Sequence, residues 1–518
     1  MSPTLAGYLV FGAYIVLNVV IGLWSGRQQK GADDLWTAGR RFGTVVMVLG
    51  LMSSIMHGGS ILSGVAFAAT YGGVAILPLI SFAAGFLVIL LFFARKLRNI
   101  GAFTLSDFMA DRYGSVGLRA FTAVVIAVSC TVYLVAQIRG MGIVLSELLS
   151  LPFVPAMAIG TLLFMFYTVV GGILAVMWNN IAQFLIMWLG LLVIIPAVWQ
   201  TAGGWTQVLD RAEALAPGWT SVAGTQWSWA YLLSWWLVWF IAYSTRIELI
   251  TKVFVARDSN VARYALPTTC LLVMLFLLFG NLYLGAAARV LVFDGLTTPD
   301  NAFPALVTRV LGPVATAIVL TSIASAANES LLLLAGAAVA HDLVRKSWHE
   351  RAGIMRSEAY YLTVSRITLV VVGVVSFVAA INTPALILAI VSYSVAMIGA
   401  TFFFPLLFGL SSRRTTPAAA AASSVGGFAT TVVWTALTLA KVPWASSVHP
   451  IVPGLAVALV LIVAVTPFTR PAPPEALARF FTRDALSPAF SPASVVATTG
   501  SDAVAAAHRI SSDPRRSR

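Results

Sequence analysis

Polar residues interrupt an apolar stretch near the start of this 518-residue chain. Within residues 43–71, a histidine, two adjacent glycines and a serine lie midway along a segment that is otherwise long enough to cross a bilayer. Adjacent glycines weaken a helix, and irregular backbone at membrane depth persists only where protein buries it or where it lines a wet cavity. Interrupted helices of this kind form the substrate and ion sites of many secondary transporters. The break predicts a solute pathway, and its candidate substrate-binding residues are His57, Gly58, Gly59 and Ser60.

His57 can serve this break in three ways. Histidine changes its charge near neutral pH, so His57 is a candidate proton site. It is also a candidate hydrogen-bond donor to an anionic substrate. The third interpretation is a neutral histidine that satisfies backbone groups freed by the break. The sequence leaves all three open.

Glu329 is the only carboxylate that the sequence places deep inside an apolar stretch, residues 313–340. A charged side chain at mid-bilayer costs at least about 2.5–3.5 kcal/mol, so such residues usually face the bundle interior and belong to a pathway. We predict that Glu329 either carries a coupling proton or completes a cation site. The alternative is a structural carboxyl group that is protonated or hydrogen-bonded, for example to Asn328 or to a neighbouring helix.

Two further apolar stretches supply the other substrate candidates. In residues 120–147, Gln137 is an uncharged polar candidate, and Arg139 could clamp a carboxylate through two parallel hydrogen bonds. Arg139 could equally extend to the membrane interface or pair with another acid. In residues 228–250, Trp235 and Trp239 lie four apart on one helix face and are expected to line the cavity.

Two groups of charges have structural interpretations instead. Glu248 and Lys252 are four residues apart, which predicts an ordinary helical ion pair at the inner end of their span. Asp107, Asp111 and Arg112 follow the third apolar stretch and are expected on the cytoplasmic surface.

A bundle of membrane-spanning helices must position these residues. The chain is 59% hydrophobic and only 10% charged, with a mean hydropathy of +0.92, which excludes an ordinary soluble protein. A bilayer core of about 30 Å requires about 20 apolar residues per helix. We therefore predict an all-α polytopic membrane protein with about thirteen transmembrane helices. The spans are expected at 5–25, 43–71, 73–94, 120–147, 153–173, 178–200, 228–250, 262–288, 313–340, 366–382, 385–410, 417–440 and 449–467.

The distribution of charge predicts the orientation of these spans. The net charge is +13, but the basic residues are scattered through short loops and form no nucleic-acid-binding helix. With the N-terminus outside and the C-terminus in the cytoplasm, nearly all Lys and Arg residues fall on the inner side, as membrane topology favours. The exceptions are Arg211, Arg289, Arg309 and Lys441 outside and Arg139 within a span. Cys130 and Cys270 lie in apolar stretches, so neither a disulfide framework nor a metal cluster is expected.

The spans divide the chain into four parts. Residues 1–42 hold the first span and a cytoplasmic loop, and residues 43–410 form the transporter core. Within the core, residues 43–200 and 228–410 are expected to be two five-helix repeats, which an odd number of spans places in opposite orientations. Two peripheral spans follow in residues 411–469. Residues 470–518 are rich in Pro, Ala and Ser and are expected to be a disordered cytoplasmic tail.

Several segments, in order, resemble the sodium:solute symporter family, which includes sodium-coupled sugar, proline, pantothenate and acetate carriers. The resemblance covers about residues 5–410. Three of its segments are most similar to the acetate and monocarboxylate branch: residues 98–101, the stretch Tyr-Leu-Val-Ala-Gln at 133–137, and the segment 335–343, which ends in His341-Asp342-Leu343. The other segments are 36–41, 59–64 with 71–72, 103–108 with 111–114, Gly140 with Gly142, and Tyr167 with Gly171, Gly172, Trp178 and Gln183.

The resemblance implies a LeuT-like core of two inverted five-helix repeats and a sodium site between the broken helix and the ninth span. Sodium prefers oxygen ligands, as other hard cations do. The family pattern puts backbone carbonyl ligands near Ser53 and Met56 and hydroxyl ligands at Ala326 and Ala327, where alanine has no side-chain oxygen. Ser325 or Ser330 could replace them through a small shift of register. The remaining cation-coupling candidates are Ile323, Glu329 and Ser330.

The sequence therefore predicts a secondary active symporter of the plasma membrane, in a bacterium the inner membrane, and not an enzyme. Its expected partners are a small solute, a coupling Na⁺ or H⁺ and the bilayer, without a cofactor, a metal beyond the sodium, or nucleic acid. The oligomeric state stays open, with a monomer among the options. The first substrate hypothesis is a monocarboxylate such as acetate or pyruvate, and the second is an amino acid such as proline. A membrane sensor that keeps the carrier fold without transporting is the alternative from another class.

Overall fold

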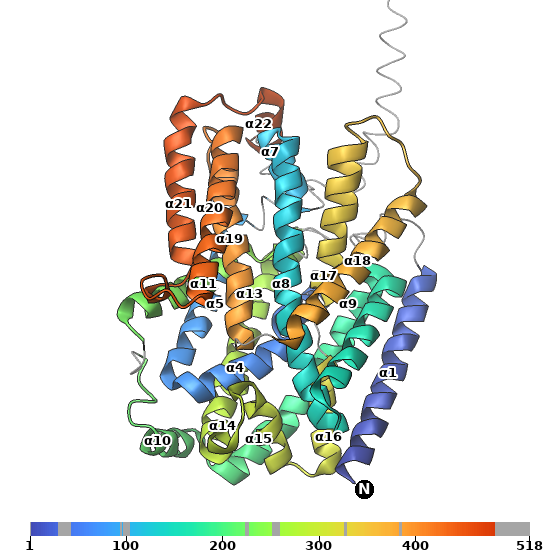
Figure 1. Ribbon diagram of the computed structural model, residues 1–518, viewed down its shortest axis with the longest axis vertical. Coiled ribbons are helices and arrows are strands. Elements are labelled where there is room, and N and C mark those ends of the chain that lie inside the picture. The colour runs from blue at the N-terminus through green and yellow to red at the C-terminus, as the bar shows by residue number, and fades with distance from the viewer. Residues whose placement is uncertain are drawn as a thin grey trace, which may run out of the picture.

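A computed structural model describes residues 2–28, 43–93, 96, 104–222, 227–250, 259–325, 329–382 and 386–481. Every regular element in these ranges is helical (Figure 1), as predicted for an all-α membrane protein. Ten stretches of this part of the chain are long and apolar enough to cross a bilayer. They are Pro3–Trp24, Gly58–Phe93, Val116–Leu149, Phe153–Val170, Trp178–Ala202, Tyr264–Leu291, Glu358–Ile381, Ile387–Ser411, Pro417–Leu439 and Ile451–Phe468.

Three of the thirteen predicted spans have no stretch of their own in this set. Residues 43–71 divide into α3 (Thr44–Ile55), which is too short, and α4 (Gly58–Tyr71), which belongs to the stretch Gly58–Phe93. Residues 228–250 contain α11 (Trp229–Thr245). Residues 313–340 contain α16 (Pro313–Ser325) and α17 (Glu329–Ala337). Hydropathy alone counted each as one crossing, because a helix break does not lower the mean hydropathy of a segment.

The central helices are α8 (Val116–Leu149) and α19 (Ile387–Ser411). Of their most apolar segments, 67% and 78% of the residues are buried, compared with about one third for α1 (Pro3–Gln28) and α18 (Glu358–Ile381). Figure 1 shows α8 running through the middle of the bundle with α1 at its margin. The outer helices expose valines and leucines, which suits contact with lipid chains.

The remaining helices complete the bundle around these two. On the α4 side they are α5 (Ile76–Val88), α13 (Ser259–Phe276), the π-helical η4 (Leu277–Tyr283) and α14 (Leu284–Leu291). The long α9 (Phe153–Ala202) contains two candidate spans, and η7 (Ala338–His349) extends α17. α20 (Pro417–Leu439) and α21 (Ile451–Val465) pack against each other and against α19.

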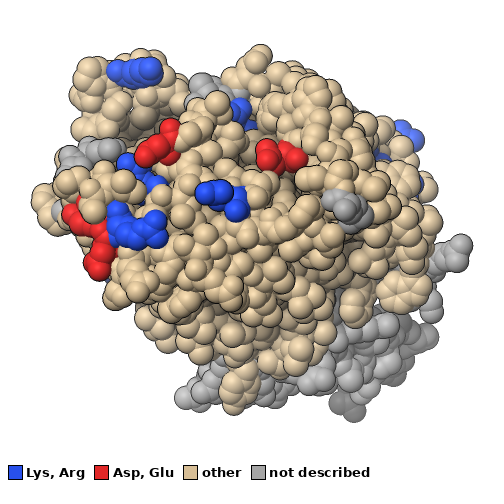
Figure 2. Space-filling view, turned by 90° about the horizontal axis from the view of Figure 1, so that it is seen from below, with Lys and Arg blue, Asp and Glu red and all other residues tan. Residues whose placement is uncertain are grey.

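The two ends of the bundle differ. One end carries α7 (Leu105–Tyr113) and α22 (Pro474–Phe481), and the other carries α10 (Trp205–Leu215), α15 (Ala302–Val310) and the start of α1 (Figure 1). Figure 2 views the second end, where charged side chains are few and of mixed sign. This is the end that the charge distribution predicts to face outward.

Part of the predicted disordered tail is ordered. Residues 474–481 form α22, which lies against α7 through an edge-to-face contact of Phe480 with Phe108, with ring centroids 5.7 Å apart. Arg413 also donates a hydrogen bond to the carbonyl oxygen of Phe481 at 2.8 Å. The amphipathic sequence of this short helix explains why it packs onto the bundle. The rest of the predicted tail, residues 482–518, lies outside the described residues.

Candidate functional site

The predicted break separates α3 from α4, and His57 caps the second half-helix. His57 Nδ1 accepts a hydrogen bond from the Ser60 N–H at 3.2 Å, and Ser60 Oγ accepts one from the His57 N–H at 3.0 Å. This reciprocal pair satisfies two of the backbone donors that a helix N-terminus leaves free. Gly59 lies directly against α8, because a Cβ atom there would be 2.5 Å from Gln137 Oε1.

A second break, which the sequence analysis did not predict, follows α11. Arg246 has an extended conformation (φ −60°, ψ 113°), and helical hydrogen bonding resumes with Leu249 and Ile250 donating to the Arg246 carbonyl. The hydroxyls of Ser244 and Thr245 donate to the carbonyls of residues four positions earlier, Phe240 and Ile241. Such bonds compete with the helical backbone pattern and favour a bend. Residues 228–250 are thus not one continuous span.

Arg246 joins the two breaks. Its Nη2 donates to the Ser54 carbonyl in α3 at 2.8 Å and to the Tyr133 hydroxyl in α8 at 3.0 Å. Its Nε lies 3.4 Å from Glu248 Oε2, and both side chains are almost completely buried. Arg246 is therefore buried beside the break and does not lie at the cytoplasmic end of its span, where the charge distribution places it. The predicted pair of Glu248 with Lys252 stays a prediction, because Lys252 lies outside the described residues. Glu248 is thus a deeply buried carboxylate, whereas the sequence placed it at the inner end of its span.

A cavity of about 70 Å³ lies between the two breaks. On the same measure one water needs about 10–15 Å³, so the space suits a few water molecules or a small solute. Its wall includes His57, Gly59, Ser60, Tyr133, Trp239 and Arg246. Arg246 is the only Lys, Arg, Asp or Glu among the described residues of this wall.

An aromatic group closes one side of this cavity. The Trp239 indole nitrogen is buried and has no hydrogen-bond partner in the described part of the chain. Trp235 lies behind it, with ring centroids 5.9 Å apart, and stacks on Phe67 at 5.2 Å and 15°. Of the two predicted tryptophans, only Trp239 is in the wall, whereas Trp235 supports it. The four-residue spacing correctly put them on one face but could not give their depth.

Arg139 lies outside the cavity wall. Its guanidinium is 5.9 Å from the centre of the Phe153 ring, and it interacts electrostatically with Asp300, in the short helix η6 (Pro299–Asn301). Arg139 therefore does not line this cavity, and the predicted pairing of Arg139 with another acid stays a prediction. Gln137 does not line the cavity either, but it is buried beside Gly59 and close to His57.

The predicted cation-coupling residues lie on both sides of a close backbone contact. A Cβ atom on Gly58 would overlap the carbonyl oxygen of Ile323 in α16, so the break and α16 touch there. Ser53 Oγ donates to the Gly50 carbonyl at 2.9 Å, and the Met56 N–H donates to Met52 at 2.7 Å. Ser330 accepts from Asn180 at 3.3 Å. Ala326, Ala327 and the side chain of Glu329 lie outside the described residues.

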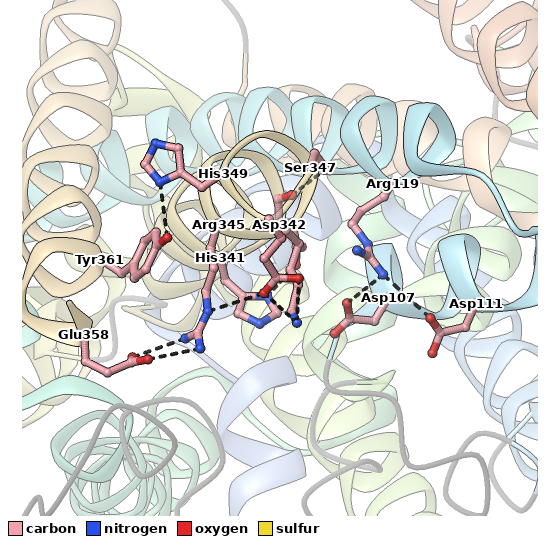
Figure 3. A network of polar contacts seen from close by, with 12 residues as sticks. Asp107, Asp111, Arg119, His341, Asp342, Arg345, Ser347, His349, Glu358 and Tyr361 are labelled. Carbon is pink, nitrogen blue, oxygen red and sulfur yellow. Dashed lines mark hydrogen bonds and ion pairs between the residues drawn. The ribbon is translucent and has the colours of Figure 1, made fainter. Parts of the chain in front are cut away.

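A separate polar network joins α7, α8 and η7 at the opposite end of the bundle from α15 (Figure 3). Asp342 Oδ1 is 2.8 Å from His341 Nδ1 and accepts from Thr104 Oγ1 at 3.2 Å. Arg119 lies 3.6 Å from both Asp107 and Asp111. Burial raises the pKa of Asp107, and the neighbouring Asp342 raises it further.

Arg112, in the same segment, is fully buried rather than on the surface as expected. It donates at 2.7 Å to the carbonyl oxygens of Gly409 and Ser412 at the end of α19. Because a buried guanidinium needs acceptors, these backbone oxygens explain why it is tolerated there.

Comparison with known proteins places this arrangement among transporters. The family model "Sodium:solute symporter family" matches residues 35–427. The osmoregulated proline transporter OpuE of Bacillus subtilis is 24% identical and covers 91% of this chain and 96% of its own. The sodium/pantothenate symporter of Escherichia coli is 25% identical, with 86% and 93% covered.

Solved structures show the same fold. A Na⁺-coupled sialic acid symporter in a substrate-bound outward-open state aligns with a TM-score of 0.74 at 18% identity, covering 90% of this chain and 99% of its own. The nucleobase-cation-symport-1 family transporter Mhp1 aligns with a TM-score of 0.51 at 16% identity, covering 87% and 96%. These alignments confirm the predicted LeuT-like fold.

Proposed function

Because the chain belongs to the sodium:solute symporter family, we propose that it imports a small polar solute across the plasma membrane, driven by a cation gradient. Members of this family are transporters and not enzymes, and Na⁺ is the coupling ion that membership favours. We propose the orientation predicted from charge, with the N-terminus outside and the C-terminus in the cytoplasm.

The cavity between the two helix breaks is the observation that supports this function most strongly. Two interrupted helices, α3/α4 and the segment after α11, meet there with backbone and side-chain polar groups that a continuous helix would not provide. Interrupted helices at a shared midplane cavity are how inverted-repeat transporters hold a solute and its ion. A lipid-facing break would leave those groups without partners.

We propose the following use of this geometry. A cation binds where the break meets α16, near Gly58 and Ile323, and draws these two backbones together. The solute binds in the adjacent cavity against Tyr133, Trp239 and Arg246. Movement of one repeat against the other then opens the cavity to the opposite side. The cation and the solute are coupled because the same break contributes to both sites.

A monocarboxylate such as acetate or pyruvate is our first substrate proposal, and an amino acid such as proline is the second. Arg246 supports an anionic substrate because guanidinium groups bind carboxylates with geometric specificity. Proline and pantothenate, the solutes named for two relatives, also carry a carboxylate.

The test is uptake by the purified full chain in proteoliposomes. Labelled acetate, pyruvate and proline would be offered with an inward Na⁺ gradient, an inward proton gradient or neither. We expect accumulation of one solute only when one of the cation gradients is imposed. Accumulation without any gradient would contradict coupling. Binding without uptake under every gradient would favour the sensor alternative, which the alanines at 326 and 327 suggest.

A further inference from the structure

The hydrogen bonds around Tyr133 determine where its hydroxyl proton points. The backbone N–H of Ser60 can only donate, so His57 Nδ1 accepts and carries no proton. The proton of a neutral His57 ring is then on Nε2, which lies 3.2 Å from the Tyr133 hydroxyl and donates to it. Arg246 Nη2 donates to the same oxygen at 3.0 Å. With both acceptor positions of the oxygen occupied, the Tyr133 O–H must donate to a third group.

One nitrogen of the Arg246 guanidinium is also available to donate a hydrogen bond to a solute. Its Nε faces Glu248, and its Nη2 donates to Ser54 and Tyr133. Within the described residues, the hydrogen bonds of this guanidinium are made by Nη2 and none by Nη1. The Arg246 side chain lines the cavity. Glu248 is not in the cavity wall, so it fixes the guanidinium from behind.

The cavity therefore presents several donors and a positive charge. The donors are the Tyr133 hydroxyl, Arg246 Nη1 and the unpartnered indole N–H of Trp239. No carboxylate belongs to the described wall, so an ammonium group bound there would lack a counter-charge. The one buried acceptor without a partner in the described wall is Asn281 Oδ1, which could accept from a hydroxyl group of a solute.

We infer that the cavity binds a small carboxylate anion without an ammonium group, whose oxygens accept from the Tyr133 hydroxyl and from Arg246 Nη1. This inference rests on the proposed function for the location of the solute, and it names the chemical group that the site recognises. Trp239 and Phe67, on the aromatic side of the wall, limit the solute to a short chain. Tyr133 and Arg246 are specificity-determining residues, and Glu248 is a positioning residue.

Binding to the purified full chain in detergent tests this inference without requiring transport. Labelled acetate and pyruvate would be displaced by unlabelled acetate, by its uncharged isostere acetamide and by L-proline, with Na⁺ present throughout. We expect acetate and pyruvate to bind and acetamide and L-proline not to compete. Acetamide competing as well as acetate, L-proline competing as well as acetate, or failure of both carboxylates to bind would overturn the inference.

Substitutions at Tyr133 and Arg246 test whether these two side chains bind the carboxylate. A hydrogen bond to a charged group is worth enough that Tyr133→Phe should weaken carboxylate binding about tenfold or more. Arg246→Gln should weaken it further, and Arg246→Lys should restore part of the loss by keeping the charge. Tyr361→Phe is the matched control, because Tyr361 also bonds a histidine, His349 at 3.2 Å, at the far end of the bundle. Affinities of Tyr133→Phe and Arg246→Lys within twofold of the wild type would overturn the assignment.

Thermal unfolding of each variant separates loss of binding from loss of the fold. If Arg246→Gln does not fold, Tyr133→Phe and Arg246→Lys decide the outcome. Carboxylate binding that depends on Tyr133, with no gradient-driven uptake, would contradict the proposed function and leave this inference intact. Gradient-driven uptake of an uncharged solute that Arg246→Lys does not affect would support the proposed function and overturn this inference.

Discussion

Asp300 is a carboxyl group held almost entirely out of water, with 2% of its surface exposed. Burial raises its pKa to about 6, while a hydrogen bond from the Ile387 N–H at 3.4 Å and the charge of Arg139 act in the opposite direction. The pKa in the folded protein is therefore above the ordinary value of 3.8. Such a group stabilises the fold most at low pH, and this contribution is lost as the pH rises through about 6.

We predict that Asp300→Asn raises the apparent unfolding temperature at pH 7.5 and has no such effect at pH 4. The asparagine keeps an acceptor for Ile387 but avoids a buried charge, and the gain is at most about 3 kcal/mol for a two-unit shift. Thermal unfolding in detergent across this pH range measures it. Asp294→Asn is the control, because that side chain is 78% exposed. A lower unfolding temperature at pH 7.5 would mean that the attraction of Arg139 outweighs burial.

Some of the residues singled out from the sequence do line the cavity, although their role in binding stays a prediction. His57, Gly59 and Ser60 stood out because glycines and polar groups at mid-membrane are costly, and all three line the cavity. Arg246 was missed because an arginine near the end of an apolar stretch normally extends to the interface. The detectable signal was Ser244-Thr245 immediately before it, since both hydroxyls can bond back to the helix and weaken it.

At the scale of elements, the contact between the first break and α16 depends on the absence of a side chain at residue 58. We predict that Gly58→Ala separates these segments, because the added Cβ would overlap the Ile323 carbonyl. Forcing a methyl group into a packed interface costs about 1–3 kcal/mol. The expected result is weaker cation dependence of solute binding, measured by titrating Na⁺ at fixed labelled solute.

Gly43→Ala is the control for this change, because a Cβ atom there has no neighbour within 4 Å. If Gly58→Ala keeps the Na⁺ dependence of the wild type while Gly43→Ala is also unchanged, the cation does not bind at this contact. An unchanged unfolding temperature would show that the backbone shifts at little cost.

Elements whose apolar residues are continuous were predicted nearly as the structure has them. Residues 417–440 correspond to α20 and residues 449–467 to the last candidate span. The interrupted elements were predicted only partly: the first break had a glycine signal, whereas the second is caused by hydroxyl groups and a charge without any glycine or proline. Local helix propensity is enough to predict a break of the first type. A break of the second type depends on tertiary contacts, such as that of Arg246 with Ser54, which the local sequence does not show.

For the whole molecule, α22 fastens the C-terminal segment to α7 and to the end of α19. We predict that removing residues 470–518 lowers the unfolding temperature, because it exposes the Phe108 ring and removes the bond from Arg413 to Phe481. Burying one phenylalanine contributes about 1.5–3 kcal/mol. Removing only residues 482–518 is the matched control and should leave the unfolding temperature unchanged. Equal stability of both truncated chains would show that α22 contributes little.

The overall class followed from composition alone, because a chain with 10% charged residues cannot cover a soluble surface of this size. The sequence could not show that α22 leaves the expected tail and packs on the bundle, since its Pro-rich start resembles a linker. Nor could it show that Arg112 is buried, because its two acceptors are backbone oxygens about 300 residues away along the chain.

The hydroxyl of Tyr133, a residue of α8, is hydrogen-bonded both to His57 at the first break and to Arg246 at the second. If one repeat moves against the other as proposed, the bond to Arg246 joins the two repeats and stretches, whereas the bond to His57 lies within residues 43–200 and is kept. A fluorine label on the Tyr133 ring would therefore report, in one nuclear magnetic resonance signal, both the binding of the solute and the conformational change of the transporter.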